Sequence, residues 1–302
     1  MKNNFISLDD ITTEELFELF ELADSLKSRF AHPPLAGKTV AMIFQKPSLR
    51  TRVSFEVGVH QLGGYPVVLS QEGIGIGTRE KASDIAQLLS RYNDAIVARL
   101  YDHKILLELA QHSTVPVINA LTDLSHPCQI LADVYTLRQH KLLRDGIKIA
   151  FIGDGNNVVN SWLEMSKLIP MHFVLAAPKG YEPSSEILKS AQNAQVSTIE
   201  ITRSPESAAR NADILYTDVW VSMGQENERK KRVKDFAGFQ INSKLLSLAK
   251  PDAVVMHCLP AHREEEITAD VLEGVRSVVL DEAENRLHIQ KAILAKLIGD
   301  IK

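Results

Sequence analysis

The sequence predicts an α/β fold of two domains, each a mainly parallel sheet flanked by helices, joined by a long helix. The chain has 302 residues, which is long for one core and fits two domains of ordinary size. Short apolar runs alternate with helical patterns, as in β-α-β crossovers. One long helical pattern over 126–144 separates two series of these units and is broken at Asp145-Gly146. We therefore expect residues 1–138 and 139–282 to form the two domains.

The expected elements follow in chain order. The first is a helix over 12–30, TTEELFELFELADSLKSRF, where Thr12 and Glu15 form a capping box ahead of helically spaced apolar residues. A strand over 39–44 comes next, and then a helix that ends at Gly63-Gly64. The other expected strands are short, β-rich apolar runs; they cover 65–69, 94–99, 115–119, 147–153, 172–177, 213–218 and 253–257. The charge-dense stretch 225–236 is predicted to be a solvated helix face or a mobile loop.

Composition excludes several classes of function. The formal net charge is −4, from 34 basic and 38 acidic residues, which argues against a nucleic-acid or anionic-membrane surface. The chain has only two cysteines, Cys128 and Cys258, without CxxC spacing, so neither a disulfide framework nor a structural zinc site is expected. The start lacks an apolar signal core, and no 18-residue apolar stretch follows. A cytoplasmic protein is the simplest interpretation.

Polar clusters follow four of the predicted strands, and Arg99 ends a fifth. The clusters are PSLRTR (47–52), HPCQ (126–129), DVWVSMG (218–224) and HCLP (257–260). In open parallel sheets, ligands collect beyond the carboxyl ends of the strands. Four such clusters are hard to explain as ordinary solvated loops.

The clusters PSLRTR and HPCQ each allow a functional and a structural interpretation. Free N–H groups at a helix start, the hydroxyls of Ser48 and Thr51, and the guanidinium of Arg50 are donors suited to a phosphate. The alternative is a capped helix with surface arginines. His126 opens the long helix, where a single histidine is more often structural than catalytic. Cys128 is expected to be a buried residue, because nothing in its neighbourhood lowers a thiol pKa.

Neither a dinucleotide nor a metal is favoured. GDGNN (153–157) imitates a nicotinamide fingerprint, but Val158 occupies the place of the third glycine. HCLPAHR offers His257, Cys258 and His262 without a fourth ligand at a suitable spacing. We therefore expect no cofactor and no metal.

Together, SxRTR, HPCQ, DxxxSMG and HCLP resemble the ordered motif set of the carbamoyltransferases, and the last two resemble the ornithine-using branch. The resemblance extends to SRYNDAIVAR (90–99), GDGNN and ENRLHIQKA (284–292), so it covers essentially the whole chain. It implies that the first domain binds carbamoyl phosphate and the second binds the amino acid. It also implies that a helix over about 283–302 packs back onto the first domain, and that the chain forms a homotrimer or a multiple of trimers.

The resemblance also implies specific site residues. For carbamoyl phosphate they are Ser48, Leu49, Arg50, Thr51, Arg99, His126, Gln129, Cys258, Leu259 and Arg286. For ornithine they are Asn157, Asp218, Ser222 and Met223. The implied catalytic residues are Thr51, Arg99, His126 and Cys258. Two positions depart from the pattern: Leu49 replaces a usual Thr, and Gly75 replaces a usual Gln, whose contact Arg79 or Lys81 is a candidate to supply.

The chemistry of these residues fits carbamoyl transfer. Arg99, Thr51 and His126 offer donors to a carbonyl oxygen that becomes negative in a tetrahedral transition state. Cys258 and the Leu259 carbonyl suit the attacking amine, Asp218 suits an α-ammonium, and Asn157 suits an α-carboxylate. The predicted reaction yields citrulline and phosphate, as in arginine biosynthesis. The alternatives are transfer to another amine, such as putrescine or a modified ornithine, and an inactive ligand-binding homologue.

Overall fold

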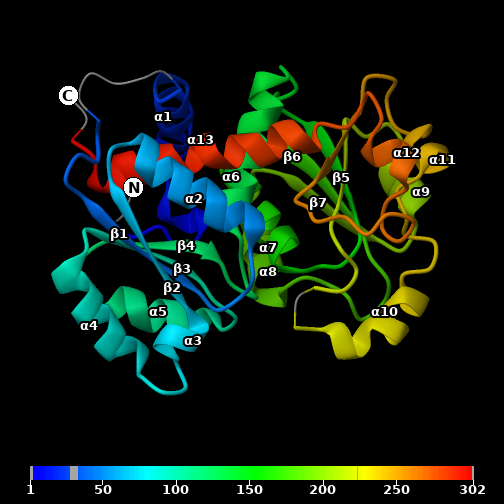
Figure 1. The fold of residues 1–302 in the computed structure, drawn as a ribbon. Coiled ribbons are helices and arrows are strands. Elements are labelled where there is room, and N and C mark those ends of the chain that lie inside the picture. Colours follow the sequence, from blue (N-terminus) through cyan, green and yellow to red (C-terminus); the bar gives the residue numbers. More distant parts are fainter. Residues whose placement is uncertain (1–2, 28–32, 223, 301–302) are drawn as a thin grey trace. The chain divides into compact units, whose positions relative to one another are not determined.

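The computed structural model describes residues 3–27, 33–222 and 224–300. The chain divides into two compact units, Met1–Ala132 with Glu284–Lys302, and Asp133–Ala283. Each unit contains a parallel sheet flanked by helices, which confirms the predicted fold class (Figure 1). The chain leaves the first unit within α6 (Pro127–Gln139) and returns to it within α13 (Val279–Ile298).

The joining helix α6 is shorter than the predicted span of 126–144. Lys141 adopts the left-handed conformation, with φ of 58°. The N–H of Leu142 donates to the carbonyl of Leu137 at 2.9 Å, and the N–H of Lys141 donates to the carbonyl of Arg138 at 3.0 Å. This is the hydrogen-bond pattern of a Schellman motif, which ends the helix without a glycine.

The first unit has a four-stranded sheet in the order β2-β1-β3-β4, with every neighbouring pair parallel. Its strands are β1 (Thr39–Phe44), β2 (Tyr65–Ser70), β3 (Ala95–Arg99) and β4 (Val117–Leu121). The sequence predicted all four, the last of them two residues early. Because β1 lies between β2 and β3, the connections out of β1 and β3 run to opposite edges of the sheet.

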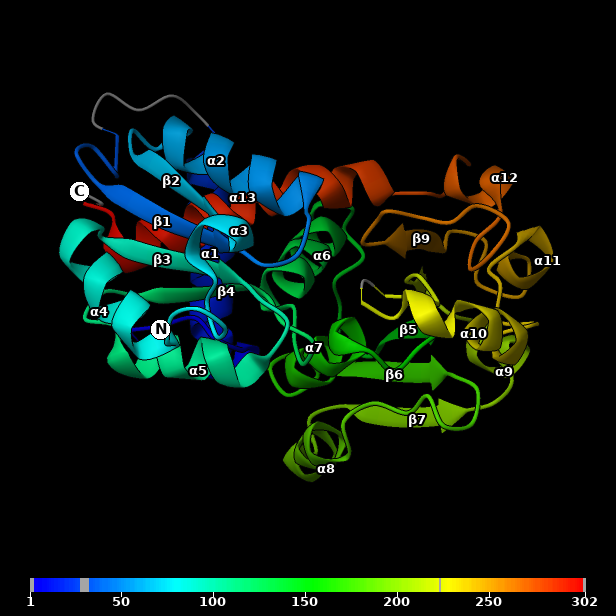
Figure 2. The same ribbon diagram turned by 60° about the horizontal axis from the view of Figure 1, so that its bottom comes forward.

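Helices cover both faces of this sheet. They are η1 (Leu8–Asp10), α1 (Thr13–Ser25), α2 (Leu49–Gln61), α3 (Gln71–Ile74), α4 (Ala82–Tyr92) and α5 (His103–His112). In both views α4 and α5 lie together on one side, opposite α2 (Figures 1 and 2). Ile85 of α4 and Leu106 of α5 share a buried cluster with Ile43 and Ile96 of the sheet. The predicted capping box at Thr12 is formed.

The second unit has a five-stranded parallel sheet in the order β7-β6-β5-β8-β9. Its strands are β5 (Ile147–Ile152), β6 (Met171–Ala176), β7 (Thr198–Thr202), β8 (Ile214–Thr217) and β9 (Val254–His257). The sequence analysis missed β7. Its residues, TIEIT, lie on a sheet edge with an exposed or half-exposed pattern, so they carry no continuous apolar signal.

The helices of the second unit are short. They are α7 (Asn157–Met165), α8 (Ser185–Ala194), α9 (Pro205–Ala209), η2 (Glu226–Glu228), α10 (Arg229–Asp235), α11 (Ser243–Leu246) and α12 (Ala269–Leu272). Trp162 of α7 packs at centroid distances of 6.3 Å from Phe173 and 5.9 Å from Tyr216. These ring contacts pack α7 against β6 and β8. Among the described helices, none is both long and apolar enough to cross a bilayer.

Candidate active site

In the first unit, polar residues follow the carboxyl ends of β1 and β3, where the strand order reverses. The last residues of these strands, Phe44 and Arg99, are partners in register. Such switch points are the usual ligand sites of open parallel sheets. After β1 the chain enters α2, whose N-cap residue Ser48 accepts a hydrogen bond from the N–H of Thr51 at 3.2 Å. The sheet therefore brings the start of α2 close to Arg99.

Thr51 joins three segments of this unit. Its Oγ1 accepts hydrogen bonds from Arg99 Nη1, at 3.2 Å, and from Arg286 Nη2. Thr51 is fully buried, and Arg99 and Arg286 are only 5% and 3% exposed. Two guanidinium groups that share one hydroxyl repel each other, and an anion beside them would offset that repulsion.

The surroundings of His126 are strongly positive. Burial, followed by the charges of Arg286, Arg99, Lys46 and Arg50, lowers the pKa of His126 well below its ordinary value. His126 is therefore neutral near pH 7 and can donate a hydrogen bond without adding charge. Lys46 is 4% exposed and forms an ion pair with the Asp123 carboxylate. Four cations consequently gather around one imidazole at the switch point.

The start of α6 combines a predicted site residue with a structural one. Gln129 is fully buried, and its N–H donates to the carbonyl of His126 at 3.1 Å. Cys128 is also fully buried, and its Sγ donates to the carbonyl of Asn119 at 3.3 Å. Burial raises the pKa of the Cys128 thiol to about 12. The prediction that Cys128 is a buried residue is confirmed.

Of the two departures from the family pattern, Leu49 is exposed and Gly75 is half-buried. Leu49 is the first residue of α2, and its side chain is 73% exposed. Gly75 ends α3 in the left-handed conformation, with φ of 62°. Arg79 Nη2 donates to the carbonyl of Gly73 at 2.7 Å, so this side chain is held by its own loop. A substrate contact from Arg79 or Lys81 stays a prediction.

The low pKa of His126 predicts a specific pH dependence of stability. The unfolded chain protonates this residue near pH ~6.5, whereas the folded chain does so only at lower pH. The contribution of neutral His126 to the free energy of unfolding is therefore fully present above pH ~6.5, and it is lost as the pH falls toward the folded-state pKa. In denaturant titrations, His126→Gln should reduce the slope of unfolding free energy against pH by up to about 1.4 kcal/mol per pH unit. The matched control is His60→Gln, an exposed residue of α2. An unchanged slope in His126→Gln would contradict the assignment.

The second unit has its own switch point, between β5 and β8. Asn156 follows β5 and caps α7, where its Oδ1 accepts from the N–H groups of Val158 and Val159 at 2.9 and 3.3 Å. Its Nδ2 donates to Asp218 Oδ2 at 2.7 Å, which connects the ends of β5 and β8. The predicted residue Asn157 is the first residue of α7 and is half-buried. The backbone of Gly155 lies so close to Pro183 that a Cβ at position 155 would be 2.4 Å from the Pro183 nitrogen, so only glycine fits in this turn.

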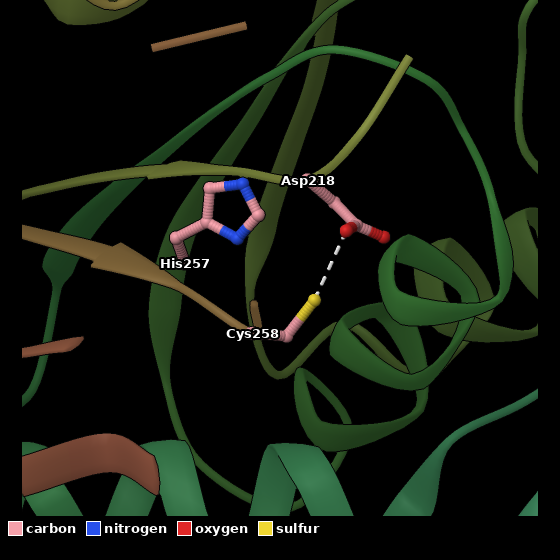
Figure 3. A group of neighbouring side chains, drawn as sticks. All are labelled: Asp218, His257 and Cys258. Atoms are coloured by element: carbon pink, nitrogen blue, oxygen red, sulfur yellow. Dashed lines mark hydrogen bonds between the residues drawn. The ribbon is translucent and has the colours of Figure 1, made fainter. Parts of the chain in front are cut away.

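Asp218 and Cys258 lie side by side at the ends of β8 and β9 (Figure 3). Cys258 Sγ donates to Asp218 Oδ1 at 3.0 Å, and the N–H of Val219 donates to the same oxygen at 2.8 Å. Desolvation of the thiol, followed by the charge of Asp218, raises the pKa of Cys258 well above its ordinary value. Cys258 is therefore a thiol near pH 7, which makes it a weak nucleophile.

The backbone of Cys258 and Leu259 is held by buried polar groups behind it. Leu259 has a φ of 56°, and its N–H donates to His257 Nδ1 at 2.8 Å. His257 Nε2 therefore carries the ring proton and donates to Glu266 Oε1, 3.1 Å away. The His257 N–H donates to Glu282 Oε2 at 3.0 Å. Burial and the neighbouring Asp133 raise the pKa of Glu282 well above its ordinary value.

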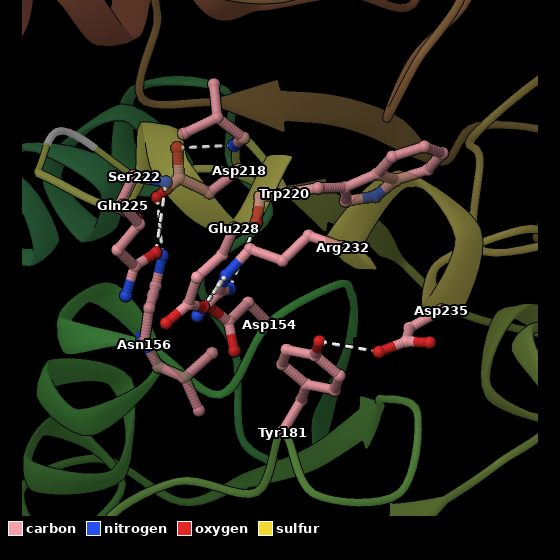
Figure 4. Close-up of polar contacts among 12 residues, drawn as sticks. Asp154, Asn156, Tyr181, Asp218, Trp220, Ser222, Gln225, Glu228, Arg232 and Asp235 are labelled. Atoms are coloured by element: carbon pink, nitrogen blue, oxygen red, sulfur yellow. Dashed lines mark hydrogen bonds and ion pairs between the residues drawn. The ribbon is translucent and has the colours of Figure 1, made fainter. Parts of the chain in front are cut away.

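A second polar network anchors the segment that carries Ser222 (Figure 4). Arg232 of α10 is 7% exposed, and its Nη1 donates to Asp154 Oδ2 at 2.8 Å and to the carbonyl of Trp220 at 3.0 Å. The N–H of Ser222 donates to Gln225 Oε1 at 3.2 Å. The prediction that 225–236 is a solvated face or mobile loop is therefore wrong for Arg232. Met223 lies outside the described residues.

Sequence reasoning missed several residues of these networks, among them Lys46, Asn156 and Arg232. Lys46 adjoins PSLRTR and Asn156 lies within GDGNN, and both follow the end of a predicted strand. Position at a strand end was therefore the available signal. Arg232 had no such signal, because its burial depends on Asp154, which lies 78 residues away in the chain.

Comparison with known protein families decides the classification. The family model for the carbamoyl-P binding domain of aspartate/ornithine carbamoyltransferase matches residues 3–139, and the model for its Asp/Orn binding domain matches residues 145–297. The chain belongs to the aspartate/ornithine carbamoyltransferase family. The two matches together span nearly the whole chain, as the motif resemblance implied.

Several relatives of this family are similar over their full length. An ornithine carbamoyltransferase from Chlorobaculum tepidum is 55% identical, with 99% of this chain and 90% of that protein covered. One from Geobacter metallireducens is 50% identical, covering 99% of this chain and 100% of that protein. The structure of ornithine carbamoyltransferase from Pyrococcus furiosus has a TM-score of 0.94 at 49% identity, covering 99% of this chain and 98% of that one.

Proposed function

We propose that this chain transfers the carbamoyl group of carbamoyl phosphate to the δ-amino group of L-ornithine, giving L-citrulline and phosphate. The observation that carries the proposal is that Arg99 and Arg286 both donate to the Thr51 hydroxyl in the first turn of α2. Their charges, with those of Lys46 and Arg50, also help to keep His126, just before α6, neutral. Membership of the carbamoyltransferase family and about 50% identity to ornithine carbamoyltransferases support the choice of substrates.

Carbamoyl phosphate binds to the first unit in this proposal. The N–H groups at the start of α2, together with Ser48 and Arg50, hold the phosphate dianion. Arg99, Thr51 and His126 donate to the carbonyl oxygen, where negative charge grows in the tetrahedral transition state. The guanidinium of Arg286 and the amide of Gln129 complete the donor set. Leu49 contributes only its backbone N–H.

Ornithine binds to the second unit. The Asp218 carboxylate pairs with the α-ammonium, and Asn157 and Ser222 with neighbouring N–H groups hold the α-carboxylate. Asn156 orients Asp218 through their 2.7 Å hydrogen bond. Met223 completes this set. Aspartate would bring a second carboxylate toward Asp218, and putrescine would leave the carboxylate-binding groups unpaired. The charge pattern therefore favours ornithine over both.

Transfer proceeds by direct attack of the amine. A free δ-amino group, like that of lysine, has a pKa near ~10.4, so a site that removes water favours its neutral form. Cys258 and the Leu259 carbonyl contact this nitrogen and orient it. The raised pKa of Cys258 keeps the thiol protonated, so the carbamoyl group is not passed through sulfur. As the tetrahedral intermediate collapses, the C–O bond to phosphate breaks and the departing phosphate takes the amine proton.

A colorimetric assay for the ureido product tests the choice of amine. Purified enzyme and carbamoyl phosphate are incubated in parallel with ornithine, putrescine and aspartate. Rapid product formation with ornithine alone is the expected result. Faster reaction with putrescine would identify an enzyme for another amine, and no product with any amine would identify an inactive binding homologue.

We also propose that the functional assembly is a homotrimer or a multiple of trimers. Leu49, Val53 and Val57 recur at every fourth position of α2 and are 73%, 45% and 37% exposed. An apolar stripe of this kind on a helix is typical of a surface that another chain covers. A second copy of the chain is the proposed occupant.

Charge on this stripe should dissociate the assembly. Val53→Glu combined with Val57→Glu is expected to reduce the mass measured by light scattering from a multiple of three chains to a single chain, because buried unpaired carboxylates are unfavourable. The control is Leu107→Glu in α5, which is 48% exposed and outside the stripe. An unchanged mass in the double variant would exclude this stripe as the interface.

Domain assignment and cellular role complete the proposal. Residues 1–138, with the C-terminal helix over about 283–302, form the carbamoyl-phosphate-binding domain, and residues 139–282 form the ornithine-binding domain. Both cysteines are free thiols, in keeping with a reducing cytoplasm. A role in arginine biosynthesis is favoured by similarity to an anabolic ornithine carbamoyltransferase from Campylobacter jejuni, whose structure has a TM-score of 0.93 at 38% identity and covers 97% of this chain and 98% of that one.

A further inference from the structure

Three potential metal ligands lie together in the segment that follows Cys258 and Leu259. They are His262, Glu265 and Glu266, and one ligand atom from each lies within 4.8 Å of the others. All three belong to the loop between β9 and α12, so they are close in sequence as well as in space. None of them contacts a substrate in the proposed reaction.

Each of these residues has a buried side-chain atom without a hydrogen-bond partner among the described residues. The atoms are His262 Nδ1, Glu265 Oε2 and Glu266 Oε2. Glu266 is the most informative, because its side chain is fully buried and its other oxygen already accepts from His257 Nε2 and from the N–H of His262. Leaving a carboxylate oxygen buried without a partner costs free energy. Three such atoms on residues whose ligand atoms lie together point to one shared partner.

The charge of the cluster favours a cation as that partner. Glu265 and Glu266 bring two carboxylates, and Arg229 pairs with Glu265 through its other oxygen, Oε1. The His257 ring contributes no charge, because its Nδ1 accepts a hydrogen bond. After the pairing with Arg229, the two carboxylates leave one net negative charge in the cluster. The three partnerless atoms are two carboxylate oxygens and one imidazole nitrogen, all of which can be metal ligands.

We propose that His262, Glu265 and Glu266 bind a divalent transition-metal ion, with Zn²⁺ as the preferred occupant. One imidazole and two carboxylates are a ligand set that zinc accepts, with water at the remaining position. Zinc also stands near the top of the affinity order for such nitrogen and oxygen sites. The bound ion ties the loop after Cys258 to the buried Glu266, which in turn holds His257.

A neighbouring group offers a competing location. Asp218, His257 and Cys258 also have ligand atoms within 4.8 Å of one another. Their ligand atoms are engaged, however: His257 Nδ1 accepts from Leu259, and the Cys258 thiol donates to Asp218. Variants that remove a ligand from only one of the two groups distinguish between these locations.

The test measures metal binding directly, without an activity readout. Full-length enzyme is stripped with a chelator and titrated with Zn²⁺ by calorimetry, and with Co²⁺ as a visible-absorbance probe of coordination. Wild type and Cys258→Ser should each bind about one Zn²⁺ per chain, with intense d–d absorption from Co²⁺ and a rise in Tm on zinc addition. His262→Ala and Glu265→Gln should each weaken binding by at least about 10-fold.

Two results would overturn the proposal. The first is no zinc binding by wild type at zinc concentrations well above the protein concentration, which would mean that water satisfies the cluster. The second is loss of binding in Cys258→Ser, which would place the metal at Asp218 and Cys258. Circular dichroism of each variant establishes that it is folded before its binding is compared.

Discussion

Replacing Arg50 with alanine is expected to weaken carbamoyl phosphate binding by about 100-fold or more. Arg50 lies in the first turn of α2, and its charge is one of four that lower the pKa of His126. A charge-assisted hydrogen bond contributes about 1.5–3 kcal/mol, and a bidentate contact contributes more. Inhibition by inorganic phosphate and calorimetric binding of carbamoyl phosphate both measure this loss. Ornithine binding should weaken as well if carbamoyl phosphate binds first.

Arg52→Ala is the matched control for this experiment. Arg52 lies on the same turn of α2, but it is exposed and pairs with Glu56 at 3.1 Å. Its removal takes away the same formal charge while leaving the switch point of the sheet intact. An equal loss of affinity in both variants would show that net charge holds the anion, and not the geometry at the start of α2.

Asp218→Asn is expected to raise the KM for ornithine and to reduce turnover, with a combined loss in kcat/KM of about 10- to 100-fold. The change removes the charge that pairs with the α-ammonium. Part of the loss should fall on turnover, because binding energy at the α-carbon orients the reacting amine. Discrimination against amines that lack an α-amino group should relax. Carbamoyl phosphate affinity should stay unchanged, since its proposed ligands in the first unit are intact.

Asp218→Asn should also change the reactivity of the Cys258 thiol, which can be measured as the rate of its alkylation. Asp218 accepts the Sγ–H bond at 3.0 Å and raises the pKa of Cys258. In Asp218→Asn that pKa should fall, so alkylation of Cys258 should become faster at a given pH. Asp252→Asn, an exposed residue before β9, serves as the control. Unchanged ornithine kinetics in Asp218→Asn would contradict the ammonium assignment and favour another amine.

The fold and much of the proposed site could be predicted because this fold places ligands at strand ends. Runs such as TVAMIF and IKIAFIG are long and apolar enough to identify strands, and the residues just after them are then candidates. Ser48, Arg99, Asp218 and Cys258 all follow that rule. The edge strand β7 lacks such a run, and its signal was the alternation of polar and apolar residues in TIEIT, which the search for apolar runs passed over.

The features of the site that the sequence did not predict depend on contacts between distant segments of the chain. Nothing near Thr51 in the sequence indicates that Arg99 and Arg286 both donate to its hydroxyl. The hydrogen bond between Cys258 and Asp218 likewise depends on the pairing of β8 with β9. From the sequence, Asp218 was expected to contact the α-ammonium and Cys258 the attacking amine, with no contact between the two residues. Burial of Arg232 also depends on tertiary structure, and its charged neighbours, which are exposed as predicted, gave no sign of it.

Carbamoyl transfer to ornithine can be followed directly by ¹³C and ³¹P nuclear magnetic resonance of labelled carbamoyl phosphate in the presence of ornithine. Wild-type enzyme should convert the labelled carbonyl into the ureido carbon of citrulline, with release of an equal amount of phosphate. Arg50→Ala and Asp218→Asn should both slow this conversion strongly. Phosphate released without labelled citrulline, beyond the rate in a sample lacking enzyme, would contradict carbamoyl transfer to ornithine.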